Sequence, residues 1–583
     1  SRRDTLKEVI ITSTRIELSF KKDSRTMTII NAETIKNSAA TTVADLLQQV
    51  AGVDIRRRGT GGGQADVYIR GGGFDQTLLL IDGIKMDDAQ TGHHTLNAAL
   101  PVEVIERIEI IKGPAARVFG QNAFTGAINI VTKKSLQNTV SLNAETGSFG
   151  QINSSVTVGK EFSNTSIIAH AGVLTSDGYR NNSDYNNANY FLKGVFNKKK
   201  QPMELLATFF DKKFGAENFY TTNPTFNEYE ETQNSLVGIS TTFHTDKFKI
   251  KPRFYWRRGQ DIFLLRRNNP AFYRNLHITN KVGVETNVSY TSKLGITGFG
   301  IDISRVSISS NNLGKRDRMM ANVFLEHRFQ LLDTKLDITP GVAITYFSDF
   351  KFHAFPGIDV GYQVSDNLKI YGNLGTTYRI PTYTDLYYAD PVTIGNPNLQ
   401  PEEAFSQEIG VKFNRGNFSG SMAFFNRDAT NLIDYVRPTS LESIFTATNI
   451  VEVATKGYEL DANYTFKISE FYQKLTIGYS FLDDNIFNKS ENLSRYSLNT
   501  LRHHFTTRFS SKFFKNVTQN IIYKYAERTT RQSYNVWDAS VIVNLSKFEF
   551  IFTANNIFNT KYIESGFVPM PGSNILIGVR FGM

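Results

Sequence analysis

The stretch Tyr458-Glu459-Leu460-Asp461-Ala462-Asn463-Tyr464-Thr465-Phe466 alternates without interruption between apolar and polar side chains. Successive side chains of a β-strand point to opposite faces, so a repeat of two places the apolar residues on one side and the polar ones on the other. The apolar side needs an apolar medium, and the charged side needs water. The stretch therefore predicts a strand that separates an apolar phase from an aqueous one.

The same period of two recurs in many segments after residue 135. Residues 136–583 are too many for one soluble sandwich, and no Pro-rich linker divides residues 140–583 into smaller units. Divided among about 22 strands, they leave about 20 residues for each strand and its loop, which fits a large outer-membrane barrel. Two or three soluble all-β domains are the alternative. Two further alternating faces consist of Val282, Val284, Val288 and Tyr290, and of Ile575, Ile577, Val579, Phe581 and Met583.

Aromatic residues divide the chain into two parts. They make up 13% of the 583 residues, yet residues 1–135 contain only five of them. This first part is rich in Gly and has short Ile/Val runs, which indicates a separate domain that precedes the strands. The five aromatics are Phe20, Tyr68, Phe74, Phe119 and Phe124.

Composition excludes several classes of protein. With no Cys, the chain has no disulfide framework, no thiolate zinc site and no Cys nucleophile. Neither a Gly-x-Ser-x-Gly elbow nor a His-Glu-x-x-His helix occurs, and Gly71-Gly72-Gly73 follows an Arg rather than opening a helix, so we expect no enzyme and no catalytic cofactor. The mean hydropathy of −0.29 and the lack of a long apolar run exclude a transmembrane helix but are compatible with a barrel.

Local patterns predict one helix and two long loops. Residues 40–55 place Val43, Leu46, Leu47 and Val50 on one helical face, with Thr41 or Thr42 as the N-cap and Gly52 at the end. Residues 176–189 and 214–234 are rich in Asn, Asp and Gly and are expected to be loops.

A series of short motifs occurs in an order that is specific to one family. Together they resemble the TonB-dependent outer-membrane transporters, and the resemblance covers essentially the whole chain. The motifs are residues 6–15, 42–47, 50–53, 67–71, 80–83, 105–109, 112–114, Gly120, 126–131, 378–381, 395–399, 401–402, 555–559 and 561–562.

The resemblance implies a fold and a domain organisation. We expect an all-β membrane protein, an antiparallel transmembrane β-barrel of about 22 strands with an N-terminal α+β plug domain inside its lumen. Residues 1–15 would hold the Ton box and a tether, residues 16–135 the plug, and residues 136–583 the barrel, located in the bacterial outer membrane.

The segment Glu8, Val9, Ile10, Ile11 and Thr12 is short, β-branched and set in a charged tail. Such a segment can add as an extra strand to the sheet edge of a partner. The resemblance identifies that partner as TonB, on the periplasmic side. A simple first strand of the plug is the alternative, and Asp4-Thr5-Leu6 also resembles the start of a Ton box.

Two groups of plug residues are predicted to have different roles. By resemblance, Arg70 and Arg107 occupy buried structural or signalling positions, and Asp82, Gly83 and Lys112 are assigned to the same group. Substrate is expected at the outward tips, in the basic loop 56–64 and the polar loop 87–95, where glycines let the backbone approach a bulky ligand. The candidate substrate contacts are Arg57, Arg58, Gln64, Asp88, Gln90, His93 and His94.

Metal and haem sites are not favoured by the sequence. Adjacent His93 and His94 on a loop are a weak metal signal, and haem receptors of this family carry a histidine between two boxes that here enclose residues 382–395, which contain none. Asp177 and Asp184, with Asn neighbours, resemble the calcium-binding region of cobalamin receptors, but two Asp are few. We assign no metal ligand, and a turn-rich extracellular loop is the preferred interpretation.

The predicted function is energised import of a scarce, bulky nutrient. Among family members the plug pattern and compact barrel most resemble cobalamin receptors, so cobalamin or another corrinoid is the expected cargo. A ferric siderophore or haem is the alternative within the family, and a passive pore or adhesin the alternative outside it. The net charge of +10 suits an anionic chelate or lipopolysaccharide phosphates equally well. Outer-membrane lipid, lipopolysaccharide and a surface lipoprotein are further candidate partners, and nucleic acid is not expected.

Overall fold

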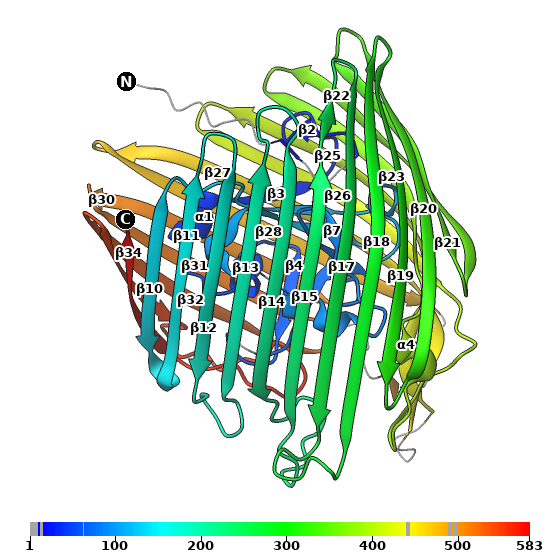
Figure 1. Ribbon diagram of the computed structural model, residues 1–583, viewed down its shortest axis with the longest axis vertical. Coiled ribbons are helices and arrows are strands. Elements are labelled where there is room, and N and C mark those ends of the chain that lie inside the picture. Colours follow the sequence, from blue (N-terminus) through cyan, green and yellow to red (C-terminus); the bar gives the residue numbers. More distant parts are fainter. Residues whose placement is uncertain are drawn as a thin grey trace.

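The computed structural model describes residues 10–11, 15–61, 63–98, 100–438, 444–487, 493–494 and 499–583. In it a closed barrel of strands surrounds a smaller N-terminal domain, which lies behind the front wall in Figure 1. Within these ranges no helix combines the length and the apolar character needed to cross a bilayer.

The barrel wall is an antiparallel sheet that closes on itself. Twenty-five described strands, β10 to β34, belong to it; β16, β24 and β29 have two residues each, and the other 22 form the wall. The ring closes where β10 pairs with β34, with Val579 opposite Ala144. The predicted fold of about 22 strands is confirmed.

The barrel elements follow one another in chain order around the ring. Their bounds are β10 (Thr139–Gly147), η3 (Ser148–Gly150), β11 (Gln151–Glu161), β12 (Ser166–Ser176), β13 (Tyr185–Phe196), β14 (Met203–Gly215), β15 (Tyr229–Thr241), β16 (Phe243–His244), β17 (Phe248–Leu264), β18 (Arg274–Ser292), β19 (Gly295–Ser310), β20 (Gly314–Leu331), β21 (Leu336–Phe347), β22 (Lys351–Ser365), β23 (Leu368–Arg379), α4 (Tyr383–Tyr387), β24 (Thr393–Ile394), β25 (Glu402–Arg415), β26 (Phe418–Arg437), β27 (Phe445–Ile468), β28 (Phe471–Phe487), β29 (Leu493–Ser494), β30 (Leu501–Phe514), β31 (Val517–Arg528), β32 (Arg531–Leu545), β33 (Phe548–Asn555) and β34 (Asn574–Gly582).

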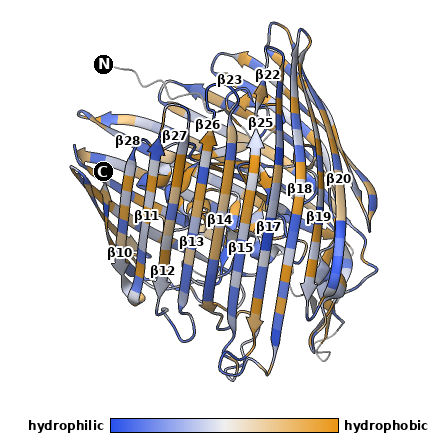
Figure 2. Ribbon diagram, viewed as in Figure 1, coloured by the Kyte–Doolittle hydropathy of each residue, from blue (hydrophilic) through white to orange (hydrophobic). Residues whose placement is uncertain are grey.

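Alternation along the strands separates a lipid face from a wet lumen. In β27 the side chain of Glu459 is buried inside the barrel, whereas its neighbour Leu460 is exposed on the outside. Figure 2 shows hydrophobic and hydrophilic residues alternating along the front strands. Because a barrel in a membrane presents its apolar face to lipid, the exposed apolar side chains lie where lipid would contact them.

The two ends of the barrel differ in the length of their connections. At one end, turns as short as 293–294, 366–367 and 546–547 join the strands; at the other, connections run through residues 216–228 and 556–573. Outer-membrane barrels have short periplasmic turns and longer extracellular loops, so this difference assigns the two sides. In Figure 1 the periplasmic end is at the top.

The plug packs a five-stranded mixed sheet, in the order β3-β8-β9-β6-β7, against short helices and a separate β4–β5 hairpin. Only the β6–β9 pair is parallel in this sheet. Its elements are β1 (Ile10–Ile11), β2 (Leu18–Ser19), β3 (Met27–Asn31), α1 (Ala32–Asn37), α2 (Val43–Leu47), β4 (Val53–Arg57), β5 (Ala65–Ile69), β6 (Thr77–Ile81), β7 (Ile84–Lys85), η1 (Gly92–Ala98), η2 (Val102–Val104), β8 (Ile105–Lys112), α3 (Ala116–Phe119) and β9 (Gly126–Thr132).

The predicted helix over residues 40–55 is shorter in the structure. It begins after the N-cap Thr42, whose side chain forms a capping box with Asp45, and it ends at Leu47. Gly52 follows with a φ of 79°, and residues 53–57 form β4 instead. The prediction was wrong there because Val53 lies at the edge of the helical face, whereas Val53 and Ile55 together follow the period of a strand and pair with β5.

The two predicted long loops are also shorter than expected. Residues 185–189 belong to β13 and residues 229–234 to β15. Asn187 and Asn234 in these segments are buried lumen-facing positions. Polar residues of this kind resemble a loop in sequence, although in a barrel they line the wet interior of a strand.

Candidate functional site

The outward tips of the plug lie beneath the extracellular loops. The tip of the β4–β5 hairpin contacts the loop after β12, because Gly59 lies close to Tyr179, and Gly61 lies close to Tyr185 at the start of β13. The segment 87–98 packs against the extracellular halves of β15 and β17. The predicted substrate contacts therefore all lie on the side from which a nutrient arrives.

Arg57 is held by an ion-pair cluster beside the tip of the β4–β5 hairpin. Its guanidinium donates to Glu564 through Nε and Nη2, both at 3.0 Å, and to Asp45 through Nη1 at 3.0 Å. Glu564 is fully buried and also accepts from Lys524 at 3.0 Å and from Gln48. Burial opposes ionisation of Glu564, but Arg57 and Lys524 outweigh it and lower its pKa to about 2. The loop 556–573 is thus tied to the plug.

Arg58 and Gln64 form a second contact with the extracellular loops. The Arg58 guanidinium donates to the Gln64 side chain and lies 5.2 Å from the ring centroid of Tyr220 and 5.7 Å from that of Phe219. Tyr220 also donates to Gln64 at 3.4 Å. Arg58 and Gln64 are buried, so the predicted flexible basic loop is covered by residues 219–220 in this structure.

Asp88 and Gln90 join the second plug tip to the barrel wall. Asp88 accepts from Arg257 of β17 at 3.1 Å and from the backbone amide of Gln90 at 2.9 Å. The Gln90 side chain donates to Asp261 of β17 at 3.2 Å. Hence Gln90 positions a barrel carboxylate as well as lining the tip.

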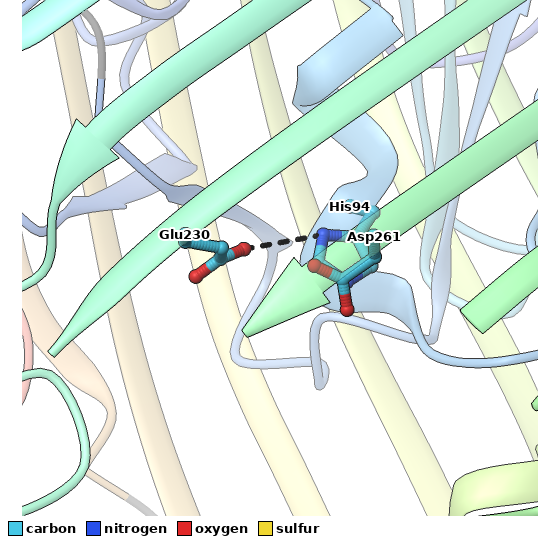
Figure 3. Close-up of side chains that lie close together, drawn as sticks. All are labelled: His94, Glu230 and Asp261. Carbon is cyan, nitrogen blue, oxygen red and sulfur yellow. Dashed lines mark ion pairs between the residues drawn. The ribbon is translucent and has the colours of Figure 1, made fainter. Parts of the chain in front are cut away.

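The adjacent histidines point to different partners. The His93 ring stacks on Phe74 at a centroid distance of 3.8 Å, and its Nδ1 lies 2.9 Å from Asp66 within the plug. His94 instead faces the barrel, with Nε2 3.2 Å from Asp261 and Nδ1 3.8 Å from Glu230 (Figure 3). Burial lowers the pKa of His93 despite Asp66, whereas Asp261 and Glu230 overcome burial and raise the pKa of His94 to about 9.

A cavity of about 100 Å³ lies between the plug tips and the barrel wall. Its plug side includes Arg57, Gln64 and Asn97, and its barrel side includes His170 and Lys212. The cavity is far smaller than the 300–1,000 Å³ of ordinary small-molecule pockets. A bulky ligand therefore cannot be enclosed there while the loops keep these positions.

Arg70 and Lys112 anchor the plug to the barrel deep in the lumen. The Arg70 guanidinium lies 2.6 Å from Glu408 and 2.9 Å from Glu459, and 4.0 Å from the centroid of Phe425. Lys112 donates to the carbonyl of Ala51 at 2.6 Å and lies 3.5 Å from Glu459. Both cations are buried, and this arrangement suits a structural or signalling role better than contact with a ligand from outside.

Asp82, Gly83 and Arg107 occupy turn and sheet positions of the plug. Asp82 accepts from Lys193 of β13 at 2.7 Å and from Thr132. Gly83 has a φ of 81°, and a Cβ there would lie 3.1 Å from the Arg253 guanidinium, so both the turn and the close approach favour glycine. Arg107 pairs within the plug, with Glu106 and Glu109.

The predicted TonB-binding segment is described only in part. Glu8, Val9 and Thr12 lie outside the described residues, whereas Ile10 and Ile11 form β1, which pairs with Leu18–Ser19 of β2. Ile11 is fully buried against the plug. Close by in the chain, Glu17 lies 2.5 Å from Lys249 next to a short turn, which places Glu17 on the periplasmic side.

The region that resembles a calcium-binding loop has other partners in this structure. Both carboxylate oxygens of Asp184 accept from Arg267, at 2.7 and 2.8 Å. A carboxylate engaged by a guanidinium in this way is a poor candidate for a calcium ligand.

The barrel residues of this site were not identified from the sequence. Glu230, Arg257 and Asp261 are each one polar residue among many at lumen-facing strand positions, and Glu564 is one polar residue in the long loop 556–573. In β15 the buried side chains are those of alternating residues from Glu230 to Gly238, so the period of two marks them as lumen-facing without singling any out. The chain separations, such as 507 residues between Arg57 and Glu564, carry no local signal.

Comparison with known proteins assigns the family. The sequence model of the TonB-dependent receptor plug domain matches residues 21–127, and that of the TonB-dependent receptor-like β-barrel matches residues 119–557. The vitamin B12 transporter BtuB of Vibrio vulnificus is 26% identical over 452 residues, which are 73% of this chain and 70% of that protein. BtuB of Vibrio cholerae is 25% identical over 566 residues, or 91% of this chain and 85% of the relative.

Solved structures share the whole architecture at low sequence identity. The ferric enterobactin receptor PfeA of Pseudomonas aeruginosa superposes with a TM-score of 0.80 at 14% identity, covering 99% of this chain and all of that one. The FrpB iron transporter of Neisseria meningitidis gives 0.80 at 15% identity, with 96% and 99% covered. At such identities the likeness concerns the fold alone.

Fold, plug and family model agree with one another. The plug lies inside the barrel and is attached to its wall by buried ion pairs. An importer with a closed channel requires such a plug, whereas an open pore does not. The chain therefore belongs to the TonB-dependent receptor family, whose members are outer-membrane importers energised through TonB rather than enzymes.

Proposed function

We propose that this protein imports cobalamin or another corrinoid across the outer membrane. The observation that carries the proposal is the similarity to vitamin B12 transporters, which extends over both the plug and the barrel and reaches 91% of the chain in one relative. A ferric siderophore is the second candidate, because the solved structures with this fold include siderophore receptors. Their 15% identity makes that argument the weaker one.

The extracellular face offers chemistry that suits a large, flat, partly apolar ligand. Tyr220 and Phe272 are about half exposed on loops that surround the plug tips. Tyr220 lies edge-on to Phe263 at 5.2 Å, and Phe272 lies beneath the Arg266 guanidinium at 4.0 Å. Aromatic faces can stack on the conjugated ring of a corrinoid, and Arg57 and Arg58 below them can receive its polar substituents.

Binding requires the loops over the plug to move. Because the cavity under them holds about 100 Å³, a corrinoid has room only if residues 219–220 and 556–573 lift away from the tips. Breaking the Arg57–Glu564 contact would free the hairpin and the loop together. We infer that the ligand replaces these contacts. Ligand binding at the extracellular side would then change the hydrogen bonds of Asp45 in α2 and of Gln48 directly after it.

Transport would then depend on the segment 8–12 at the other face. A short β-branched segment can pair with the sheet edge of TonB. Since Ile11 is buried in the plug and β1 is already paired with β2, Ile10 and Ile11 must leave this position before TonB can bind the segment. We propose that ligand binding favours this release.

Equilibrium binding distinguishes the two cargoes. The purified full chain in detergent is incubated at micromolar ligand with cyanocobalamin, haem and a set of ferric siderophores, and adducts are measured by native mass spectrometry. We expect one cobalamin per chain and a weaker or absent signal for the iron chelates. A ferric siderophore adduct without a cobalamin adduct would reverse the assignment and leave the family membership untouched.

A further inference from the structure

We propose that His94, Glu230 and Asp261 form a binding site for a divalent transition-metal ion that joins the plug to the barrel wall. One donor atom from each of the three side chains lies within 4.8 Å of the others, and all three residues are buried. The residues come from η1, β15 and β17. Figure 3 shows the carboxylates of Glu230 and Asp261 directed toward the imidazole of His94.

The spacing of the donor atoms is close to that of a metal site. Zinc bonds of about 2.0–2.2 Å place neighbouring donors of a tetrahedral site about 3.4 Å apart. Nε2 of His94 and Oδ2 of Asp261 are 3.2 Å apart. Since all three donors already lie within 4.8 Å of one another, bringing them to the spacing of about 3.4 Å requires shifts of at most about 1.4 Å.

Unsatisfied polar atoms point into this cluster. Both carboxylate oxygens of Glu230 and Oδ1 of Asp261 are buried and accept no hydrogen bond from the described residues. Arg58 and Lys212 contribute positive charge near Glu230 without donating to it. Buried carboxylates normally have hydrogen-bond donors or a cation as partners, so these oxygens have capacity for a metal ion, which would replace the proton on the His94 imidazole that faces them.

The surroundings supply further groups that metal sites use. His277 of β18 lies directly opposite Asp261 in the sheet register, and its Nδ1 is buried without a hydrogen bond in the described structure, so it is a candidate fourth ligand. The Asn97 amide lies 2.9 Å from Nδ1 of His94. With its oxygen turned to that nitrogen, Asn97 would accept Nδ1–H and leave the Nε2 lone pair for the metal.

The donor set selects a class of ion. One or two imidazoles with two carboxylates suit zinc and its first-row neighbours, whereas calcium prefers an all-oxygen shell. Because the ligands come from both domains, the ion would hold η1 against β15 and β17. This site includes His94, which the sequence predicts as a substrate contact, but binding of the ion does not depend on the identity of the cargo.

Metal titration of the full chain tests the site. Folded protein without an affinity tag is stripped with EDTA and desalted, then titrated with zinc chloride by calorimetry. We expect one zinc ion per chain, with weaker binding of calcium. Glu230→Gln and Asp261→Asn should each weaken zinc binding by at least about tenfold, since even outer-shell changes cost that much.

Two matched variants serve as controls. Glu145→Gln changes a buried lumen glutamate that also has an unpartnered oxygen, and His504→Gln changes a buried lumen histidine on β30, away from β15 and β17. Both should bind zinc like the parent. Cobalt added to the parent chain should give the visible absorption bands of nitrogen and oxygen coordination, a readout that needs no variant to fold. Absence of stoichiometric zinc and of these bands, or equal affinity in the parent, Glu230→Gln and Asp261→Asn, would overturn the proposal.

Discussion

At the scale of single residues, the extracellular site consists of buried charged side chains, each paired with a side chain of opposite charge. Glu564 is the clearest case, since Arg57, Lys524 and Gln48 converge on one carboxylate that has no exposure to solvent. Removing one partner of a buried ion pair is costly because the other charge stays buried and unpaired. Glu564 should therefore control whether the loop 556–573 stays on the plug.

Replacing Glu564 by Gln should release this loop. We expect Glu564→Gln to destabilise the closed arrangement by about 3–5 kcal/mol, which hydrogen exchange of the amides in residues 556–573 would detect as lost protection. Asp317→Asn is the control, because its partner Arg305 and Asp317 itself are more than half exposed, so that pair contributes about 0–1 kcal/mol. Equal protection in both variants would contradict the role of Glu564 in holding the loop 556–573 on the plug.

The same carboxylate gives the loop a pH dependence with a defined sign. The pKa of Glu564 in the folded protein is about 2, below the ordinary value of 4.5 for a glutamate. Its stabilising contribution is therefore complete above pH 4.5 and is lost as the pH falls from about 4.5 to about 2. Protection of residues 556–573 in the parent should decline over this window, and Glu564→Gln should lack that decline.

At the scale of elements, α2 links the outer site to the core of the plug. The helix has only five residues, and its last residue, Leu47, is buried in the main plug cluster. Its neighbour Gln48 donates to Glu564, while Asp45 accepts from Arg57. A helix this short depends on its cap, which here is the reciprocal pair of Thr42 and Asp45.

Loss of the Thr42 N-cap should destabilise α2, which connects the extracellular site to the core of the plug. Thr42→Ala removes the acceptor for the amide of Asp45 and should destabilise α2 by about 1 kcal/mol, measured as faster hydrogen exchange of the amides in residues 43–47. Thr41→Ala is the matched control, since Thr41 makes only a 3.3 Å contact with Asp45 and is not the N-cap. Equal exchange rates of these amides in Thr42→Ala and Thr41→Ala would contradict a stabilising role for the Thr42 cap.

Strand β27 and helix α2 show which parts of the fold could be predicted from the sequence. The strand period at residues 458–466 predicted the barrel because every second residue there obeys one physical constraint, lipid on one side and water on the other. The cap at Thr42 was predicted as one of two choices, but the helix end was placed too late, because Val53 can extend the helical face as well as begin a strand. Local patterns cannot separate a short helix followed by a strand from one longer helix.

The site was predicted only on its plug side. The tips at residues 56–64 and 87–95 were located from Gly content and family position, and the structure brings them under the extracellular loops. Their partners Glu230, Asp261 and Glu564 could not be predicted, since each lies far away in the chain. Glu230 and Asp261 resemble other lumen-facing polar residues, and Glu564 resembles other polar loop residues. Only closure of the sheet brings them together.

At the scale of the whole molecule, the plug is held by ion pairs at both faces and in the middle. Arg15 pairs with Glu285 at the periplasmic side, Arg70 with Glu459 deep in the lumen, and Arg57 with Glu564 at the outer side. Buried pairs of this kind fix a geometry while giving little net stability against apolar replacements. Such an interface suits a plug that must stay in place at rest and rearrange when force is applied from the periplasm.

Uptake of labelled cyanocobalamin tests the central claim most directly. Cells lacking their own cobalamin receptor would express either the full chain or a chain without residues 8–12, and cell-surface binding and internal label would be measured separately. We predict that the full chain gives TonB-dependent uptake, and that the deletion keeps surface binding but loses uptake. Uptake that is unchanged by the deletion or by loss of TonB, or the absence of cobalamin binding to a chain that is present at the surface, would contradict energised corrinoid import.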